Sequence, residues 1–232
     1  MTFKTGNYFH FRNSSKGIAT RIKNIKGHSE INTDNMGLSI HYSGNFNKHA
    51  SLSEMIEEVK DIVEIYKWEY TIHEEQFPPN NFGKKTFNKK IYGISFTPPE
   101  CETVSLSFLS NGKMSCSVRL KYFGNSTNEA EQQYLTMLAV KTQYAGIEIH
   151  KLIVHLLKYL SKKYFTDFKV DDEGKYWESG DEKLLNKIFR QYNDLLQNVS
   201  FGLQNCPIKK GETFEQYFER ILKRSHNNKK TD

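Results

Sequence analysis

Residues 101–123, CETVSLSFLSNGKMSCSVRLKYF, alternate between apolar and polar side chains almost without interruption. An alternation with a period of two is typical of β-strands that turn one face toward a core. Asn111-Gly112 lies in the middle of the stretch, and this dipeptide is a strong signal for a tight turn between two strands. The stretch therefore predicts a β-hairpin with one apolar face and one polar face of serine, arginine and lysine.

The length of the turn decides which residues of the hairpin lie opposite each other. A two-residue turn at Asn111-Gly112 would place apolar side chains opposite polar ones on both faces. A three-residue turn, residues 110–112, keeps both faces consistent and needs a left-handed residue at its last position, which Gly112 supplies. We therefore predict the three-residue turn and three pairs: Phe108 with Met114, Leu106 with Cys116, and Val104 with Val118.

The patterns on either side of the hairpin predict an α+β protein. A Ser51/Glu54 capping box starts an amphipathic helix, and a Thr213/Gln216 capping box starts another near the end of the chain. Helices grouped on one side of a mostly antiparallel sheet define this class. We expect the order strand, helix, three strands, with one sheet face covered by a C-terminal helical layer. The expected strands before the hairpin are 38–42, 68–75, with Trp68, Tyr70 and Ile72 pointing inward, and 91–97. Residues 129–143 and 145–164 are expected to form one broken helix or two consecutive helices, and residues 181–199 a further helix.

We expect a single domain over residues 36–225, with the sheet in 36–128 and a mainly helical part in 129–225. Residues 1–35 hold six Lys/Arg and two Asp/Glu and show no hydrophobic period. They are either a flexible basic leader or a misannotated start, and the sequence leaves both interpretations open. Residues 226–232 are expected to fray.

The net charge of +6 resides at the two ends of the chain. Residues 1–35 carry +4 and residues 209–232 carry +3, which leaves −1 for residues 36–208. Because a nucleic-acid groove needs clustered positive charge on the folded body, the net charge supports nucleic-acid binding only weakly. No apolar run approaches the roughly 20 residues of a membrane-spanning helix. We expect a cytoplasmic protein without a membrane partner.

The sequence contains no motif for a metal site or an activated nucleophile. The three cysteines form no C-x-x-C pattern and are odd in number, which favours reduced thiols. His150 and His155 are five residues apart and cannot share a ligand, so we expect partly exposed helix residues. The run Gly83-Lys84-Lys85-Thr86 lacks the glycine spacing of a phosphate loop. We assign no catalytic residue, no metal and no cofactor.

Two groups of residues are candidate binding surfaces. The polar face of the predicted sheet is either a shallow site of hydroxyls, imidazoles and a guanidinium or an ordinary solvated face. A basic stripe along one helix either holds phosphates or is simply exposed. The sheet-face candidates are Ser39, His41, Thr71, His73, Ser105, Ser107, Ser117 and Arg119, and the stripe candidates are Lys151, His155, Lys158 and Lys162.

Residues 36–123, with the runs MGLSIHYSG and YGISFTPPECETVSLSFLSNGKMSC, resemble uncharacterised bacterial proteins, and this resemblance implies no activity. The predicted order of elements is similar, in topology alone, to one half of the TATA-binding-protein fold, whose open sheet binds the DNA minor groove. Serines occupy the places where that fold carries intercalating aromatic side chains. The topological likeness therefore implies no function by itself.

We expect a non-catalytic cytoplasmic protein that binds another protein or a small ligand through its sheet face or its helical surface. Two alternatives remain open. One is nucleic-acid binding through the same face and the basic tails, which the nearly neutral body does not favour. The other is an enzyme of a class that no motif in the sequence identifies.

Overall fold

The computed structural model describes residues 38–213, 215–217 and 219–221, so the expected leader (1–35) and tail (226–232) lie outside the described residues. The chain divides into a compact unit, Gly37–Asp194, and a second unit to which the residues from Leu195 onward belong. The class is α+β, as the sequence predicts. Within the described ranges, no helix combines the length and the apolar composition that crossing a lipid bilayer requires.

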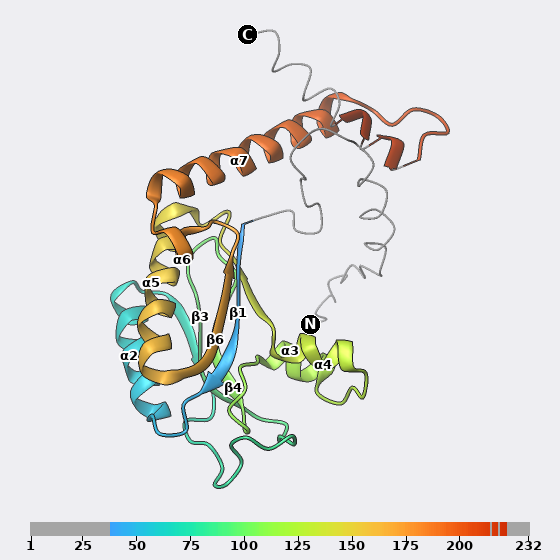
Figure 1. Cartoon of the computed structure of the whole chain (residues 1–232). Helices are drawn as coiled ribbons and strands as arrows, with labels where there is room; N and C mark the ends of the chain where they lie inside the picture. The colour runs from blue at the N-terminus through green and yellow to red at the C-terminus, as the bar shows by residue number, and fades with distance from the viewer. Residues whose placement is uncertain (1–37, 214, 218, 222–232) are drawn as a thin grey trace, which may run out of the picture. The chain divides into compact units, whose positions relative to one another are not determined.

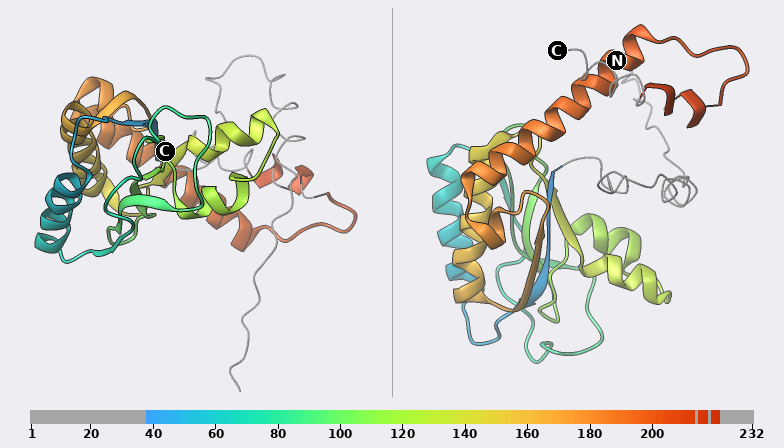
Figure 2. Two further views of the ribbon diagram at one scale, coloured as in Figure 1. Left: turned by 90° about the horizontal axis from the view of Figure 1, so that it is seen from below. Right: turned by 45° about the horizontal axis from the view of Figure 1, so that its top comes forward.

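The first unit contains two antiparallel three-stranded sheets, with strand orders β5-β1-β6 and β2-β3-β4. Helices α2 and α5 lie side by side on one side of the sheets, and α3 lies with α4 on the other side (Figures 1 and 2). The elements in chain order are β1 (Ser39–Phe46), α2 (Leu52–Ile65), β2 (Glu69–Ile72), β3 (Ile91–Thr97), β4 (Val104–Leu109), α3 (Ser117–Phe123), α4 (Glu129–Thr136), β5 (Leu138–Lys141), α5 (Gly146–Tyr164), β6 (Phe165–Asp172), α6 (Tyr176–Ser179) and α7 (Glu182–Asn205).

The main core lies between the sheets and helices α2 and α5. Helix α2 begins where the capping box predicts, since Ser51 Oγ accepts a hydrogen bond from Glu54 N at 3.2 Å. Its apolar stripe faces the sheets, and its polar side chains face solvent. The side chains that α2 buries are Leu52, Met55, Ile56, Val59 and Val63.

The three-residue hairpin turn is confirmed. Phe108 and Met114 form an antiparallel bridge across it. Gly112 has a φ of +88°, the left-handed conformation that the last turn position requires. The register of the turn is therefore set by the local chemistry of the chain.

The return arm of the hairpin joins the two sheets. Phe46 N on β1 donates to Gly112 O at 2.7 Å, and Met114 N donates to Gly44 O, also on β1, at 2.9 Å. Because the same arm pairs with β4 through Phe108, it lies between β4 and β1. The sequence-based expectation of one sheet is thus corrected to two sheets that a short shared segment connects.

The outer part of the predicted hairpin does not form, because the chain turns into helix α3 after Cys116. The backbone of Ser105, which the outer arm would have bonded, is taken by the phenol of Tyr42 on β1. This hydroxyl donates to Ser105 O and accepts from Ser105 N, both at 3.0 Å. A side chain from another strand therefore replaces the expected partner. The predicted pairs that are wrong are Leu106 with Cys116 and Val104 with Val118.

The serine face of β4 is buried, and the expectation that it stays open is wrong. Ser107 and Ser115 are fully buried, and Ser105 is only 9% exposed. Ser107 Oγ donates to Ser115 O at 2.7 Å, and Ser115 Oγ donates to Leu135 O at 2.8 Å. These serines satisfy backbone carbonyls beneath α3 and α4, where an apolar side chain would leave them unpaired.

We predict that Ser115→Ala lowers the free energy of unfolding by about 1–3 kcal/mol, because Leu135 O then loses its partner in a buried site. Urea denaturation of the full chain measures the loss. Ser117→Ala, at an exposed position two residues later, is the matched control and should change stability by less than about 0.5 kcal/mol. Equal losses in both variants would show that the Ser115 hydroxyl has no special role.

Two further expectations are corrected by the strand pairing. Residues 138–141, expected within a helix, form β5, because Val140 pairs with Ile40 of β1 and both are fully buried. Tyr70, expected to point inward from β2, is 37% exposed and donates its hydroxyl to Glu64 Oε1 at 2.8 Å. In both places tertiary contacts override a local pattern that is only a few residues long.

The residues from Leu195 onward have a small core of their own, formed by Cys206, Tyr217 and Ile221. The second capping box is reciprocal, since Gln216 N donates to Thr213 Oγ1 at 3.3 Å and Thr213 N donates to Gln216 Oε1 at 3.1 Å. The sequence therefore locates this helix start correctly.

Candidate functional site

The eight sheet-face candidates do not share one face. Ser39 and His41 lie on β1, in the sheet β5-β1-β6. A second group belongs to the other sheet or follows its edge strand, and a third group lies on helix α3. The expected single surface is therefore wrong, because the chain forms two sheets and replaces the last strand by a helix. The second group is Thr71, His73, Ser105 and Ser107, and the third is Ser117 and Arg119.

The two candidates on β1, Ser39 and His41, both contact Glu173 of the same protein. His41 Nε2 lies 3.6 Å from Glu173 Oε1, and interaction with this carboxylate raises the pKa of His41. Ser39 N donates to Glu173 Oε2 at 2.7 Å. Glu173 therefore holds the start of β1 to the end of β6.

The basic stripe on α5 mostly contacts the protein's own side chains. Lys151 Nζ is 2.7 Å from Glu182 Oε1, and His155 Nε2 is 3.2 Å from the Tyr176 hydroxyl. Lys158 Nζ lies over the rings of Tyr176 and Trp177, at 5.9 Å and 5.4 Å from their centroids. The remaining stripe candidate is Lys162, which is exposed. Three of the four side chains thus help to pack α5 against its neighbours, so the stripe is a weak candidate for a ligand site.

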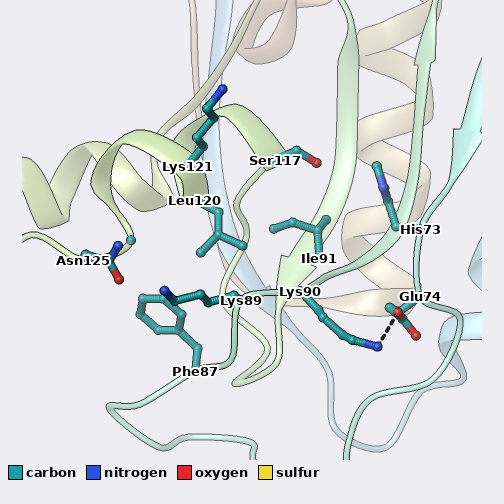
Figure 3. A pocket seen from close by; sticks show the side chains of 11 residues that line it. His73, Glu74, Phe87, Lys89, Lys90, Ile91, Ser117, Leu120, Lys121 and Asn125 are labelled. Carbon is teal, nitrogen blue, oxygen red and sulfur yellow. Dashed lines mark hydrogen bonds and ion pairs between the residues drawn. The ribbon is translucent and has the colours of Figure 1, made fainter.

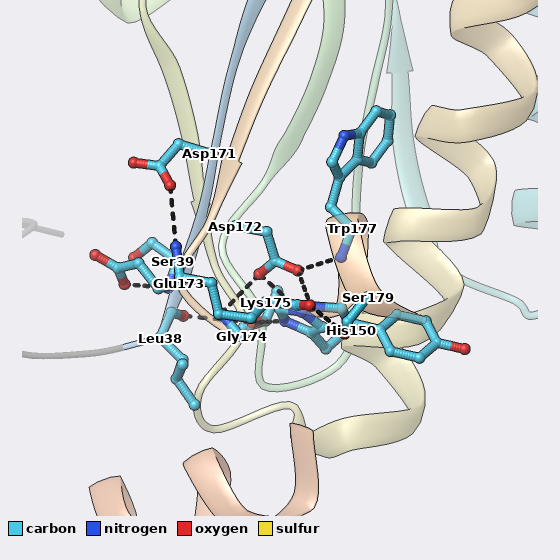
Figure 4. Close-up of polar contacts among 12 residues, drawn as sticks. Leu38, Ser39, His150, Asp171, Asp172, Glu173, Gly174, Lys175, Trp177 and Ser179 are labelled. Atoms are coloured by element: carbon cyan, nitrogen blue, oxygen red, sulfur yellow. Dashed lines mark hydrogen bonds and ion pairs between the residues drawn. The ribbon is translucent and has the colours of Figure 1, made fainter. Parts of the chain in front are cut away.

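A hydroxyl, an imidazole and a carboxylate lie in a row at Thr142, His150 and Asp172 (Figure 4). Thr142 Oγ1 is 2.8 Å from His150 Nδ1, and His150 Nε2 is 3.1 Å from Asp172 Oδ1. This order is similar to that of a hydrolase triad, but all three residues are fully buried and no substrate reaches them. We assign the row a structural role. The expectation that His150 is partly exposed is wrong, while His155 is exposed as expected.

The Cys101 thiol is not an activated nucleophile. Burial raises the pKa of Cys101 to about 12, and the neighbouring Glu102 carboxylate acts in the same direction. Its Sγ donates to Lys141 O at 3.4 Å. Cys116 is half-buried at the start of α3 rather than on a strand face. No disulfide joins the three cysteines, and among the described residues no group of three His, Cys, Asp or Glu side chains could hold a metal ion.

The structure instead brings two of the candidates into an open pocket of about 700 Å3, which we call the lysine pocket. It lies between the end of β2, the start of β3 and helix α3 (Figure 3). Its apolar floor is formed by Phe87, Ile91 and Leu120, which belong to a small hydrophobic cluster beneath α3 and α4. The other lining residues are His73, Glu74, Lys89, Lys90, Ser117, Lys121, Gly124 and Asn125.

Three lysines, Lys89, Lys90 and Lys121, line the lysine pocket. Lys90 Nζ is 2.7 Å from Glu74 Oε1, so its charge is largely compensated. Lys89 lies beside Phe87, and Lys121 extends from α3 on the opposite side (Figure 3). Lys89 and Lys121 form no ion pair with any other described residue. The pocket lining therefore carries two uncompensated positive charges.

His73 contributes a polar group rather than a charge. Burial lowers the pKa of His73, and its Nε2 lies 3.1 Å from Ser95 Oγ. The ring is therefore neutral at physiological pH and can donate or accept one hydrogen bond. Ser117 and Asn125 add a hydroxyl and an amide to the same pocket.

The lysine loop, residues 76–90, is held in place by long-range hydrogen bonds. Asn81 Nδ2 and Asn88 N both donate to Ser110 Oγ, at 2.8 Å and 2.9 Å. Asn111 Nδ2 donates to Lys84 O at 3.0 Å. The loop is thus fixed against the hairpin turn, which positions its lysines before any ligand arrives.

Two aromatic side chains anchor the start of the same loop. The ring of Phe77 lies 5.3 Å from that of Phe46 and 5.2 Å from that of Tyr92. Phe82 packs edge-on against Phe77 at 4.7 Å. These rings bury apolar surface and so hold a loop whose other side chains are mostly polar.

Sequence reasoning missed the pocket although it contains one strong local signal. The run KKTFNKK, residues 84–90, places two lysines on either side of Phe87. Read alone, it is a polar loop, and nothing in the sequence shows that α3 meets it across the apolar floor. Comparison with protein-family models, curated proteins and solved structures finds no match to this chain, so its site is defined by its own geometry.

Proposed function

We propose that the protein binds an anionic ligand at the lysine pocket. The observation that carries the proposal is that two lysines without an ion-pair partner among the described residues, Lys89 and Lys121, line the same preformed hollow. Lysines usually project from a surface separately or pair with carboxylates, whereas here they flank a floor of apolar side chains. An anion placed between them would be attracted by both charges.

The floor and the size of the pocket support a ligand that has an apolar part as well as a charge. The volume lies within the range of about 300–1,000 Å3 that is usual for small-molecule sites. Phe87, Ile91 and Leu120 offer a surface that water wets poorly. The polar groups of His73, Ser117 and Asn125 are available to orient the ligand.

Titration of the full-length, 15N-labelled chain with sodium phosphate tests this proposal, with sodium chloride at equal ionic strength as the salt control. We expect saturable shifts of the backbone amide signals of residues 87–91 and 117–125. Lys89→Gln combined with Lys121→Gln should abolish the saturation, because both of these charges are lost.

Lys158→Gln combined with Lys162→Gln is the matched control, since it removes the same charge from the stripe on α5 and should leave the phosphate response unchanged. Loss of the response in this control, with retention in the pocket variant, would move the site to the stripe and refute the lysine pocket. Shifts that sodium chloride reproduces would likewise refute it.

A further inference from the structure

The sequence segment that contributes most of the lysine pocket is rich in basic residues. Residues 81–125 carry seven Lys/Arg and two Asp/Glu, a net charge of +5. Since residues 36–208 carry −1 in total, the remainder of that stretch carries −6. The charge of the body is therefore unevenly distributed along the sequence, and the basic segment is bordered by Glu74 at the pocket and by Glu129 and Glu131 on α4.

The basic side chains continue beyond the pocket. Lys84 and Lys85 are exposed at the far end of the lysine loop, and Lys113 is exposed in the hairpin against which this loop is fixed. On the other side, Arg119 lies on α3 two residues before Lys121. A small anion in the pocket would leave these charges unused, whereas a polyanion crossing it would use them.

Two aromatic side chains are neighbours of these charges in the sequence. Phe87 forms part of the pocket floor between two pairs of lysines. Tyr122 on α3 is 70% exposed, and Lys121 Nζ lies 5.9 Å from the centroid of its ring. An exposed ring of this size beside a cation has no role in the core of the protein, but it offers a stacking surface to a ligand with planar groups.

We infer that the anionic ligand is a single-stranded nucleic acid, with one nucleotide seated in the lysine pocket and its neighbours along α3 and the lysine loop. The inference rests on the proposed function and specifies its ligand. Cationic side chains that track a phosphate backbone, interleaved with aromatic rings on which bases stack, are the arrangement by which proteins bind single strands without reading sequence. A duplex keeps its base faces stacked inside and would leave Phe87 and Tyr122 unused, and an acidic peptide carries charge without planar bases.

The test measures binding of a fluorescein-labelled 12-nucleotide oligothymidylate to the full chain by fluorescence anisotropy over a range of salt concentrations. We expect saturable binding that weakens with salt, and Lys89→Gln should reduce the slope of log K against log salt by about 0.7. Tyr122→Ala should weaken binding about ten-fold or more, because a stacking surface is lost.

Tyr144→Ala is the matched control for the tyrosine, since Tyr144 is 63% exposed and has Lys141 Nζ 5.7 Å from its ring centroid, as Tyr122 has Lys121. It should leave the affinity unchanged. Both tyrosines are largely exposed, so neither variant should unfold the protein, and thermal melts verify this. Equal effects of the two variants would overturn the inference.

Three competitors distinguish the ligand classes. Thymidine monophosphate that binds as tightly as the 12-mer, polyglutamate that displaces the 12-mer at equal charge concentration, or a 12-base-pair duplex that binds more tightly would each overturn the single-strand inference. If the 12-mer fails while phosphate still saturates the pocket, the inference alone fails. If neither probe responds to the loss of Lys89 and Lys121, the proposed function fails with it.

Discussion

Asp172→Ala is expected to lower the free energy of unfolding by about 3–5 kcal/mol, a large share of the roughly 5–15 kcal/mol by which folded domains are stable. Asp172 is fully buried at the end of β6 and is 3.1 Å from His150 Nε2. Its two carboxylate oxygens also accept hydrogen bonds from the backbone N–H groups of Gly174, Tyr176 and Trp177, each at 2.8 Å. Removing the carboxylate leaves these buried donors and the imidazole without an acceptor.

The neighbouring residue provides the control for this variant. The side chain of Asp171 is 74% exposed and lies 3.6 Å from Lys175 Nζ, so Asp171→Ala should change the stability by less than about 1 kcal/mol. Urea denaturation followed by circular dichroism measures both variants. If Asp172→Ala does not fold, the measurement can be made on Asp172→Asn, because this variant keeps one carbonyl oxygen as an acceptor. Asp172→Asn should still be less stable than Asp171→Ala. Equal stability of the Asp171 and Asp172 variants would contradict the structural role of the row.

The same carboxylate should make the protein sensitive to acid. Burial by itself would raise the pKa of Asp172, but the hydrogen bond with His150, its charge and the backbone N–H groups of Trp177 and Gly174 outweigh burial and lower it. A carboxyl group whose pKa is lower in the folded state stabilises the fold above its unfolded pKa, which is about 3.9. This contribution is lost as the pH falls from about 4 through the lower folded pKa, so acid should narrow the stability difference between the native chain and Asp172→Asn.

The parts of the fold that the sequence predicts are those that local chemistry determines. The start of α2 at Ser51 and the three-residue turn ending at Gly112 each depend on the preferences of a few adjacent residues. The second arm of the hairpin and the strand β5 are decided by partners far along the chain. The hydroxyl of Tyr42 forms hydrogen bonds with the backbone of Ser105, and β1 pairs with β5. Neither contact can be recognised from the local pattern of apolar and polar residues.

The residues of the lysine pocket likewise include some that the sequence singles out and some that it does not. His73 and Ser117 were among the residues that the polar alternation singled out, and both line the lysine pocket. Lys89 and Lys121 were not, because they are 32 positions apart and line the same pocket only in the folded chain. The buried serines Ser105, Ser107 and Ser115 were predicted to be exposed, because a regular polar face indicates contact with solvent unless the elements that cover it are known.

Gly93→Ala is expected to lower the free energy of unfolding by about 3 kcal/mol or more. Gly93 lies in the central strand β3 with a φ of +117°, a conformation that residues with a Cβ atom rarely adopt. A Cβ atom at this position would lie 2.4 Å from Leu106 O and 3.2 Å from the Cα of Ser107. Both contacts are with the backbone of β4, so no flexible side chain can move away to relieve the clash.

Gly93 also helps to position residues of the lysine pocket. His73 N donates to Gly93 O at 2.8 Å, and Gly93 N donates to Glu74 O at 2.9 Å, so this glycine fixes the two residues at which β2 leads into the pocket. Gly83→Ala is the matched control, because Gly83 also has a positive φ of +73° but no atom beyond Gly83 and its two chain neighbours lies within 4 Å of the position that its Cβ atom would occupy. This variant should cost only about 1 kcal/mol. Thermal and urea unfolding of the two variants compare a backbone clash with conformational strain alone. A Gly93→Ala protein as stable as the Gly83→Ala protein would show that β3 and β4 do not approach as closely as the structure has them, and the floor of the lysine pocket would then lose its support.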